Sequence, residues 1–242
     1  MTDPLSDARI IASWHKNASP WTSAVRGNQI ESRRLVTNEA IVEAVLSRSP
    51  RTALDIGCGE GWLVRALADN GVDAIGVDAI PSLIEQARQA GGGEFRVASY
   101  ESISNGELQV KVDAAVANFS LIGKESVENL LASVPELLND DGALIVQTLH
   151  PLVATGDLPY VDGWRTGSWA GCSEDFSDPA PWYFRTVESW KQLLADSGLM
   201  LIDTREPLHP TTGKPASIIF TAKKARGSSE LEKTQKRKTQ KR

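Results

Sequence analysis

The sequence predicts an α/β protein whose mainly parallel sheet is covered by helices on both faces. Strand-like apolar segments and amphipathic helical segments alternate along most of its 242 residues, and this order produces parallel strands joined by right-handed crossovers. A glycine-rich turn, GCGEG at residues 57–61, joins the first strand to the next helix. A chain of this length has room for one domain with a substantial core.

Two helical segments precede the first strand, at about residues 7–15 and 29–47. We expect an amino-terminal helical cover formed by residues 1–48. Strand, helix, strand and helix then follow in turn at residues 52–57, 61–70, 73–78 and 81–90. Pro81 suits the first turn of the last of these helices, where its missing N–H leaves no hydrogen bond unmade.

The alternation continues through three further strands, at residues 94–99, 112–118 and 142–149. A helix at residues 125–139 precedes the third of them, although it contains Pro135, and the turn NDDG follows that helix. A last helix and two last strands are expected at residues 186–198, 199–208 and 216–224. The turn between these two strands contains Pro and Gly and predicts an antiparallel hairpin.

Residues 151–185 fit neither the strand period nor the helix period. This segment carries four prolines and seven aromatic side chains. A structureless loop of this length in a compact domain is typically a lid or a substrate-binding insertion. We therefore expect substrate-binding aromatic side chains here, namely Tyr160, Trp164, Trp169, Trp182 and Tyr183.

Composition and charge indicate a cytoplasmic protein. The two cysteines are too few for a disulfide framework and lack metal-ligand spacing, so we expect no metal site. No apolar stretch approaches membrane-spanning length, and the amino terminus lacks the features of a signal peptide. The last fourteen residues hold six Lys or Arg against two Glu, within a chain of net charge −5. We expect residues 226–242 to form a disordered basic tail, whereas the acidic remainder disfavours a nucleic-acid partner.

The glycine turn carries an acid that argues against a phosphate ligand. Glycines at a strand end let a ligand approach the backbone, and the N–H groups at the helix start then point at it. The spacing here is G-x-G-x-G, whereas dinucleotide-binding turns have G-x-G-x-x-G. Asp55, two residues before the first glycine, would repel a pyrophosphate by on the order of 1 to 4 kcal/mol. This acid favours a cationic group.

A second acid, Asp78, ends the second strand, about 20 residues after the glycines. At this position a carboxylate accepts hydrogen bonds from both hydroxyls of a ribose. The ligand is therefore expected to carry a ribose and a positive charge and to lack a phosphate. S-adenosylmethionine meets these requirements with its adenosine, its ammonium and its sulfonium, and S-adenosylhomocysteine would be the product.

The segments LDIGCGEG, GVDAIPSLIEQAR, VDAAVANFSLI and DGALIVQTLHP resemble the successive motifs of class I S-adenosylmethionine-dependent methyltransferases, in particular the small-molecule, ubiquinone-methyltransferase-like group. The resemblance covers roughly residues 35–225. It implies a single Rossmann-like methyltransferase domain at residues 49–225, with a seven-stranded sheet whose last strand runs antiparallel between its neighbours. The aromatic segment at residues 151–185 would be an insertion after the fifth strand.

The resemblance also implies a set of cofactor-binding residues. The methionine moiety would be surrounded by Asp55, Gly57, Cys58, Gly59 and Gly61. Asp78 would hold the ribose with Ala79 beside the adenine, and Asn118 and Phe119 match the motif near the methyl group. Many members bind the adenine amino group with an acid after the third strand, whereas this chain offers Ser99 and Tyr100 there.

Three further residues have competing interpretations. His150 ends the fifth strand, where it could act as a general base or fill a structural role before Pro151. Trp21 could cover the cofactor or a substrate, or it could anchor the amino-terminal helix. Arg34, next to Arg33, could pair with the cofactor carboxylate or an acidic substrate, or it could be solvated.

The expected function is methyl transfer to an oxygen or nitrogen of a small-molecule acceptor, which could be aromatic, a secondary metabolite or quinone-like. The protein would act as a monomer or a homodimer. A tRNA or other nucleic-acid methyltransferase and a non-catalytic S-adenosylmethionine-binding protein remain alternatives, and a dinucleotide oxidoreductase is a weaker one.

Overall fold

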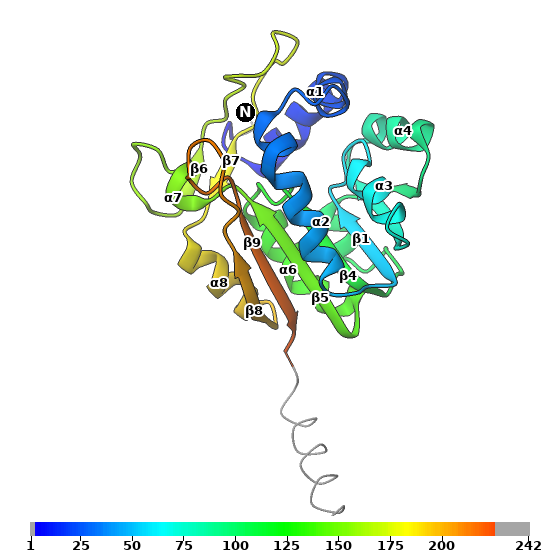
Figure 1. Cartoon of the computed structure of the whole chain (residues 1–242). Helices are drawn as coiled ribbons and strands as arrows, with labels where there is room; N and C mark the ends of the chain where they lie inside the picture. Colours follow the sequence, from blue (N-terminus) through cyan, green and yellow to red (C-terminus); the bar gives the residue numbers. More distant parts are fainter. Residues whose placement is uncertain (1–2, 226–242) are drawn as a thin grey trace, which may run out of the picture.

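The computed structural model describes residues 3–225, so the predicted tail at residues 226–242 lies outside the described residues. A seven-stranded sheet in the order β3-β2-β1-β4-β5-β9-β8 forms the centre of the molecule, with helices on both faces (Figure 1). Strand β9 alone is antiparallel to its neighbours β5 and β8. The predicted fold class is confirmed. The strands are β1 (Thr52–Ile56), β2 (Asp73–Asp78), β3 (Glu94–Val97), β4 (Val112–Asn118), β5 (Leu138–Thr148), β8 (Leu199–Arg205) and β9 (Ile218–Lys224).

The helices bury two apolar layers against the two faces of this sheet. Helices α2, α3 and α4 cover one face, and α5, α6 and α8 cover the other. None of the helices within residues 3–225 is long and apolar enough to cross a membrane. The helices are α1 (Asp7–Arg26), the π-helix η1 (Arg33–Thr37), α2 (Asn38–Leu46), α3 (Trp62–Ala68), α4 (Pro81–Ala90), α5 (Tyr100–Ser104), α6 (Glu125–Leu137), α7 (Pro151–Ala154) and α8 (Val187–Asp196).

The predicted end of the first helix near His15 is wrong, because α1 runs on to Arg26 and through Pro20. The face that this helix buries contains polar residues, Ser13 and Asn17, which interrupt the apolar period of the sequence. Asn17 Nδ2 donates to the backbone oxygens of Ser13, at 2.9 Å, and of Ser177, at 2.7 Å. These hydrogen bonds compensate for the burial of the amide, and the helix continues as a twenty-residue element.

Two other local predictions need correction. The residues of the predicted NDDG turn belong to the start of β5. The pairing of β5 with β4 shifts register between Val112 and Ala114, and this shift accommodates the residues of β5 that have no partner in β4. Residues 151–185 are not structureless, because they contain α7 and the antiparallel strands β6 (Gly163–Arg165) and β7 (Trp182–Phe184). Proline density and short strands hid this pairing in the sequence.

Candidate active site

The glycine turn after β1 adopts a backbone that other residues would strain. Gly57, Gly59 and Gly61 have φ values of +78°, +57° and +86°. A Cβ on Gly57 would lie 2.4 Å from Ser120 Cβ, and one on Gly61 would lie 2.6 Å from the Phe95 ring. The first and third glycines therefore allow close packing beneath the turn, whereas a Cβ on Gly59 would lie 3.4 Å from Trp21 Nε1, at ordinary contact distance.

A cavity of about 400 Å³ opens at this turn, at the carboxyl ends of the central strands, and α1 forms one of its walls. We call it the cofactor cavity. Predicted cofactor-binding residues that line it are Gly57, Gly59, Asp78, Ala79, Ser99, Tyr100, Asn118 and Phe119. Predicted residues outside its lining are Asp55, Cys58, Gly61 and Arg34. Cys58 is buried in the apolar layer between sheet and helices, in agreement with a packing role.

Asp55 lies beneath the cavity as a buried carboxylate. Its exposed fraction is 2%, and Oδ1 has no hydrogen-bond partner among the described residues. Burial raises the pKa of Asp55 to about 7; the nearby Asp78 carboxylate raises it further and Arg33 opposes the shift. A charged group this poorly solvated requires a compensating cation.

Asp78 is held at the cavity edge by the backbone. Its Oδ2 accepts a hydrogen bond from the N–H of Gly59 and its Oδ1 accepts one from the N–H of Ile80, both at 2.9 Å. Burial raises the pKa of Asp78, and these backbone hydrogen bonds oppose that shift. The carboxylate therefore has a fixed position, and each oxygen retains a lone pair for a ligand hydroxyl.

Glu60 fastens the turn to the amino-terminal helix. This carboxylate is 1% exposed and accepts hydrogen bonds from Arg65 Nη2 and from Arg26 Nε, both at 2.7 Å. Its charge is thus shared between two guanidinium groups. The partly buried ion pair with Arg26 ties the end of α1 to the glycine turn.

A second cavity of about 370 Å³, the acceptor cavity, adjoins the first. The two share the lining residues Trp14, Trp21, Phe119 and Ile122. Phe119 has a φ of +55°, a left-handed backbone that is uncommon for a large side chain and costs free energy. The hydrogen bond that its N–H donates to the backbone oxygen of Gln147, at 2.8 Å, holds this conformation. Phe119 is therefore fixed at the boundary between the cavities.

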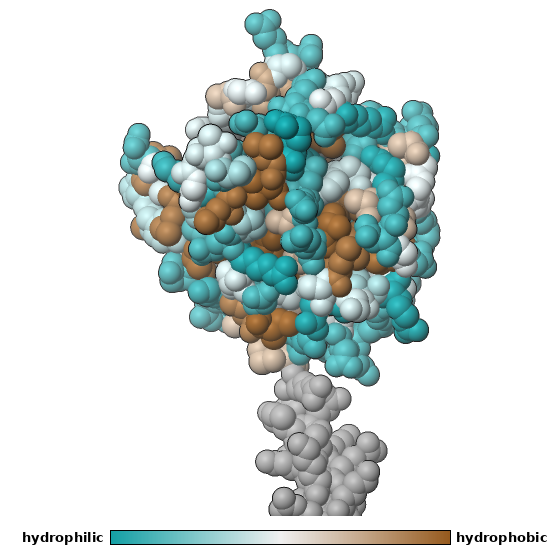
Figure 2. Space-filling model, viewed as in Figure 1, coloured by the Kyte–Doolittle hydropathy of each residue, from teal (hydrophilic) through white to brown (hydrophobic). Residues whose placement is uncertain are grey.

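The part of the acceptor cavity near α7 is apolar. Leu149, Pro151 and Ala154 line the cavity near α7, and apolar side chains gather around α7, β6 and β7 on the face drawn in Figure 2. Exposed side chains of this segment include Leu152, Leu158 and Val161. A molecule with an apolar body is suited to such a lining.

The predicted substrate-binding aromatics divide into two groups. Trp21, Trp169, Trp182 and Tyr183 line the acceptor cavity. Tyr160 and Trp164 do not: the Tyr160 hydroxyl accepts a hydrogen bond from the N–H of Val187, at 2.9 Å, and the Trp164 ring packs edge-on against Tyr183. Tyr160 thus ties the insertion to the start of α8, whereas Trp164 is a contact within the β6–β7 pair.

Neither Arg34 nor His150 lines either cavity, so neither contacts the site of its predicted role. Arg34 is exposed, whereas the neighbouring Arg33 is buried and lines the acceptor cavity. His150 is 3% exposed, with its Nε2 3.3 Å from Glu206 Oε1 in an approach that lacks hydrogen-bond geometry. Arg33 thus takes the place expected of Arg34, and the acceptor cavity is formed without His150.

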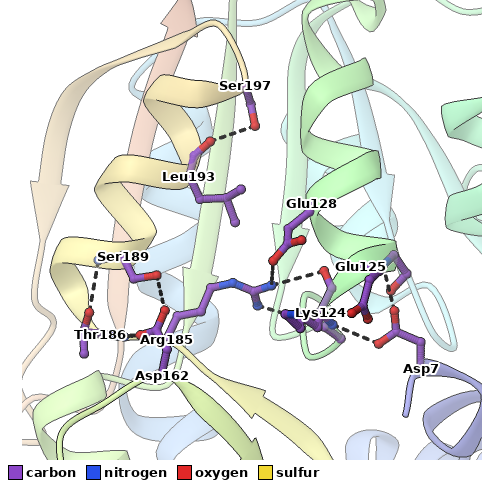
Figure 3. Close-up of polar contacts among 12 residues, drawn as sticks. Asp7, Lys124, Glu125, Glu128, Asp162, Arg185, Thr186, Ser189, Leu193 and Ser197 are labelled. Atoms are coloured by element: carbon purple, nitrogen blue, oxygen red, sulfur yellow. Dashed lines mark hydrogen bonds and ion pairs between the residues drawn. The ribbon is translucent and has the colours of Figure 1, made fainter.

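The sequence predicted an amino-terminal helical cover that includes Trp21, but it did not identify the other side chains that α1 contributes to the site. Asp7 at its start accepts hydrogen bonds from the N–H groups of Lys124, at 2.9 Å, and Ser126, at 2.7 Å, at the start of α6 (Figure 3). Ile10, Ile11 and Trp14 line the cofactor cavity. Trp14 and Trp21 are seven residues apart, a spacing that places both on one face of a continuous helix and could have revealed this wall.

The aromatic insertion is attached to α1 through Asp178. The Asp178 carboxylate accepts hydrogen bonds from Arg9, at 2.9 Å, and Lys16, at 2.6 Å, while its backbone oxygen accepts one from Ser13. Trp169 of the same insertion packs edge-on against Trp14. Insertion and helix are therefore attached to each other at the walls of the two cavities.

We expect Asp178→Ala to loosen the attachment of the insertion to α1. Amide hydrogen exchange across residues 166–181 should become several-fold faster, because the ion pairs to α1 are lost and opening becomes easier. The matched control is Asp175→Ala, another carboxylate of the insertion, whose side chain contacts Ser173. Equal exchange rates in the two variants would contradict the attachment.

Comparisons with known proteins identify the family. A family model described as a methyltransferase domain matches residues 31–204. The chain belongs to this methyltransferase family. The match confirms the predicted methyltransferase domain.

The methyltransferase resembles several characterised proteins over part of their length. Ubiquinone biosynthesis O-methyltransferase of Methylococcus capsulatus is 36% identical over 116 residues, which cover 45% of this chain and 48% of that protein. Trans-aconitate 2-methyltransferase of Rhodococcus jostii is 29% identical over 160 residues, with coverages of 65% and 61%. Malonyl-[acyl-carrier protein] O-methyltransferase of Acetivibrio thermocellus is 30% identical over 108 residues and is matched over only 37% of its length.

A solved structure shares the fold over nearly the whole chain. The 1,6-didemethyltoxoflavin-N1-methyltransferase of Burkholderia thailandensis, with bound 1,6-didemethyltoxoflavin and S-adenosylhomocysteine, superposes with a TM-score of 0.63 at 18% identity. The superposition covers 93% of this chain and 92% of that one.

Proposed function

We propose that this enzyme methylates an oxygen or nitrogen atom of a flat small molecule bound in the acceptor cavity. The observation that carries the proposal is the pair of adjoining cavities at the carboxyl edge of the sheet, which meet at Phe119 and Trp21. One cavity presents the glycine turn and Asp78, and the other is enclosed by aromatic rings. A volume of about 370 Å³ suits a small molecule.

Residues in and beneath the cofactor cavity have the chemistry that S-adenosylmethionine requires. Asp55 supplies a buried carboxylate with an unpaired oxygen for a positive group, and Asp78 supplies acceptors for ribose hydroxyls. Gly57 and Gly59 bring the backbone of the turn to the cavity lining. The bound cofactor supplies an activated methyl group.

The contribution of the protein to the reaction is alignment in a dry site. Trp21 and Phe119 fix the acceptor ring relative to the cofactor cavity, while α1 and the insertion exclude water. Alignment of two reactants lowers a barrier by on the order of 7 to 11 kcal/mol. A base within the cavity is not required for this contribution.

The test is incubation of the protein with S-adenosylmethionine labelled in its methyl group and a cell extract. The extract is then separated into small-molecule, nucleic-acid and protein fractions, and label is expected in the small molecules. Label in RNA instead would support the nucleic-acid alternative. Tight binding of S-adenosylhomocysteine without transfer into any fraction would support a non-catalytic binding protein.

Trp21→Ala and Trp164→Ala give a matched comparison. We expect Trp21→Ala to slow label transfer roughly tenfold, because the acceptor ring loses a stacking surface at the boundary of both cavities. Trp164→Ala should transfer at close to the original rate, since its ring lies outside both linings. Initial rates at saturating cofactor measure both. Equal losses would mean that Trp21 acts only through folding.

A further inference from the structure

The two cavities carry charged side chains of opposite sign. Among the described residues, the charged residues lining the cofactor cavity are the acids Asp7, Asp78 and Glu101. Those lining the acceptor cavity are Arg33 and Arg185. Within residues 3–225, no carboxylate, lysine or histidine belongs to the acceptor lining. The charged side chains that line the acceptor cavity are therefore all positive.

Arg33 is the less committed of the two arginines. Its guanidinium lies over the rings of Trp21, 5.4 Å from the centroid, and Trp62, at 5.0 Å. In the described chain its side chain donates one hydrogen bond, from Nε to Asn38 Oδ1 at 3.2 Å, and Nη2 has no partner. Burial lowers the pKa of Arg33 to about 10, so the side chain stays charged at neutral pH.

The nearby acids do not neutralise this charge by direct contact. Glu60 is held by Arg26 and Arg65, and Asp55 forms no ion pair with Arg33 within the described residues. A buried cation without a paired anion is costly. An anion bound in the cavity would remove that cost.

Arg185 adds a fixed positive charge to the same cavity. Figure 3 shows its guanidinium directed toward the chain before α6. It donates hydrogen bonds to the backbone oxygens of Gly123, at 2.8 Å, and Lys124, at 3.2 Å, and lies 3.5 Å from the half-exposed Glu128. Because Arg185 is engaged by these three contacts and Arg33 by one hydrogen bond, Arg33 is the more available of the two for direct pairing with a ligand.

We propose that the acceptor is a flat aromatic acid, a carboxylic acid or an acidic phenol, bound as its anion with Arg33 as the partner of the ionised oxygen. This inference rests on the proposed function and narrows its acceptor to one class. Arg33 lines the acceptor cavity and is absent from the lining of the cofactor cavity. The surrounding Trp14, Trp21 and Trp182 offer faces for an aromatic ring.

An ionised acceptor explains why the cavity lining needs no base. A lone pair of the ionised oxygen forms the new carbon–oxygen bond, while the carbon–sulfur bond breaks and its electron pair stays on sulfur. No proton is released, so none has to be removed. Anion and sulfonium become neutral together, and this loss of charge is favoured in a site of low dielectric.

The test measures binding of matched acids and amides to the protein saturated with S-adenosylhomocysteine. The pairs are 2-naphthoate with 2-naphthamide, 4-hydroxybenzoate with 4-hydroxybenzamide, and salicylate with salicylamide. Titrations at pH 7.5 follow tryptophan fluorescence and calorimetric heat. We expect the acids to bind about tenfold more tightly than their amides or better, the usual effect of a charge-assisted hydrogen bond.

Variants at two neighbouring positions assign the effect to Arg33. Arg33→Gln should abolish the preference for acids, Arg33→Lys should retain part of it, and the exposed control Arg34→Gln should keep all of it. Equal affinity for acids and amides, or no binding of any acid in the panel, would overturn the inference. It is also overturned if Arg33→Gln weakens S-adenosylhomocysteine binding while the acid preference persists, since Arg33 would then serve the cofactor carboxylate. Failure of the unaltered protein to bind S-adenosylhomocysteine would instead contradict the proposed function.

Discussion

Replacing Asp78 by alanine is expected to weaken S-adenosylhomocysteine binding by roughly 100-fold. Hydrogen bonds to a charged group contribute about 1.5 to 3 kcal/mol each, and a ribose offers two hydroxyls to this carboxylate. The substitution also removes the acceptors of the Gly59 and Ile80 N–H groups, so the glycine turn loses part of its support. Both effects reduce affinity.

Calorimetric titration measures the loss, and two further variants interpret it. Asp73→Ala changes an exposed acid at the opposite end of β2 and should leave the affinity unchanged. Asp78→Asn keeps the shape of the side chain and should lose less than alanine. A folded Asp78→Ala protein with unaltered affinity would remove the ribose assignment.

The central sheet was predictable because its signals are local. Strands β1, β2 and β4 are short apolar runs, and each is followed by a turn or a helix start that can be read from neighbouring residues. The acids at the glycine turn identified the cofactor for the same reason. Asp55 and Asp78 lie at or near the ends of neighbouring strands, positions that the chain order alone predicts.

The walls of the acceptor cavity were less predictable because they depend on contacts between distant residues. Asn17 and Ser177 are 160 positions apart, yet their hydrogen bonds decide that α1 continues past His15. The π-helix η1 has a wider turn than an α-helix, and this changes which side chain faces inward. Arg33 is buried and Arg34 exposed, a distinction that the sequence ESRRLV does not contain.

Replacing Asp55 by asparagine is expected to stabilise the ligand-free protein above pH 7 and to weaken cofactor binding there. The pKa of Asp55 is about 7 in the folded protein, against an ordinary value of 3.8. Between these values the folded state binds the proton more tightly than the unfolded state, so stability falls as pH rises from about 4 to about 7. Above pH 7 the ionised carboxylate costs up to about 4 kcal/mol, three pKa units at 1.36 kcal/mol each.

Urea unfolding at pH 5 and pH 8 tests the stability, and calorimetric binding of S-adenosylmethionine between pH 6 and pH 8 tests the function. The original protein should lose free energy of unfolding between pH 5 and pH 8, while Asp55→Asn should lose less. The affinity of the original protein for the cationic cofactor should fall as pH drops below 7, because protonation of Asp55 removes its negative charge. Asp55→Asn should bind the cofactor weakly at every pH. Asp78→Ala provides an internal check. Removal of the Asp78 charge lowers the pKa of Asp55, so the loss of stability in this variant should have its midpoint at a lower pH than in the original protein. If neither the stability nor the cofactor affinity of the original protein changed with pH, the role of Asp55 would be contradicted. A carboxylate that stabilises the bound cation and destabilises the ligand-free fold must show both effects over the same pH range.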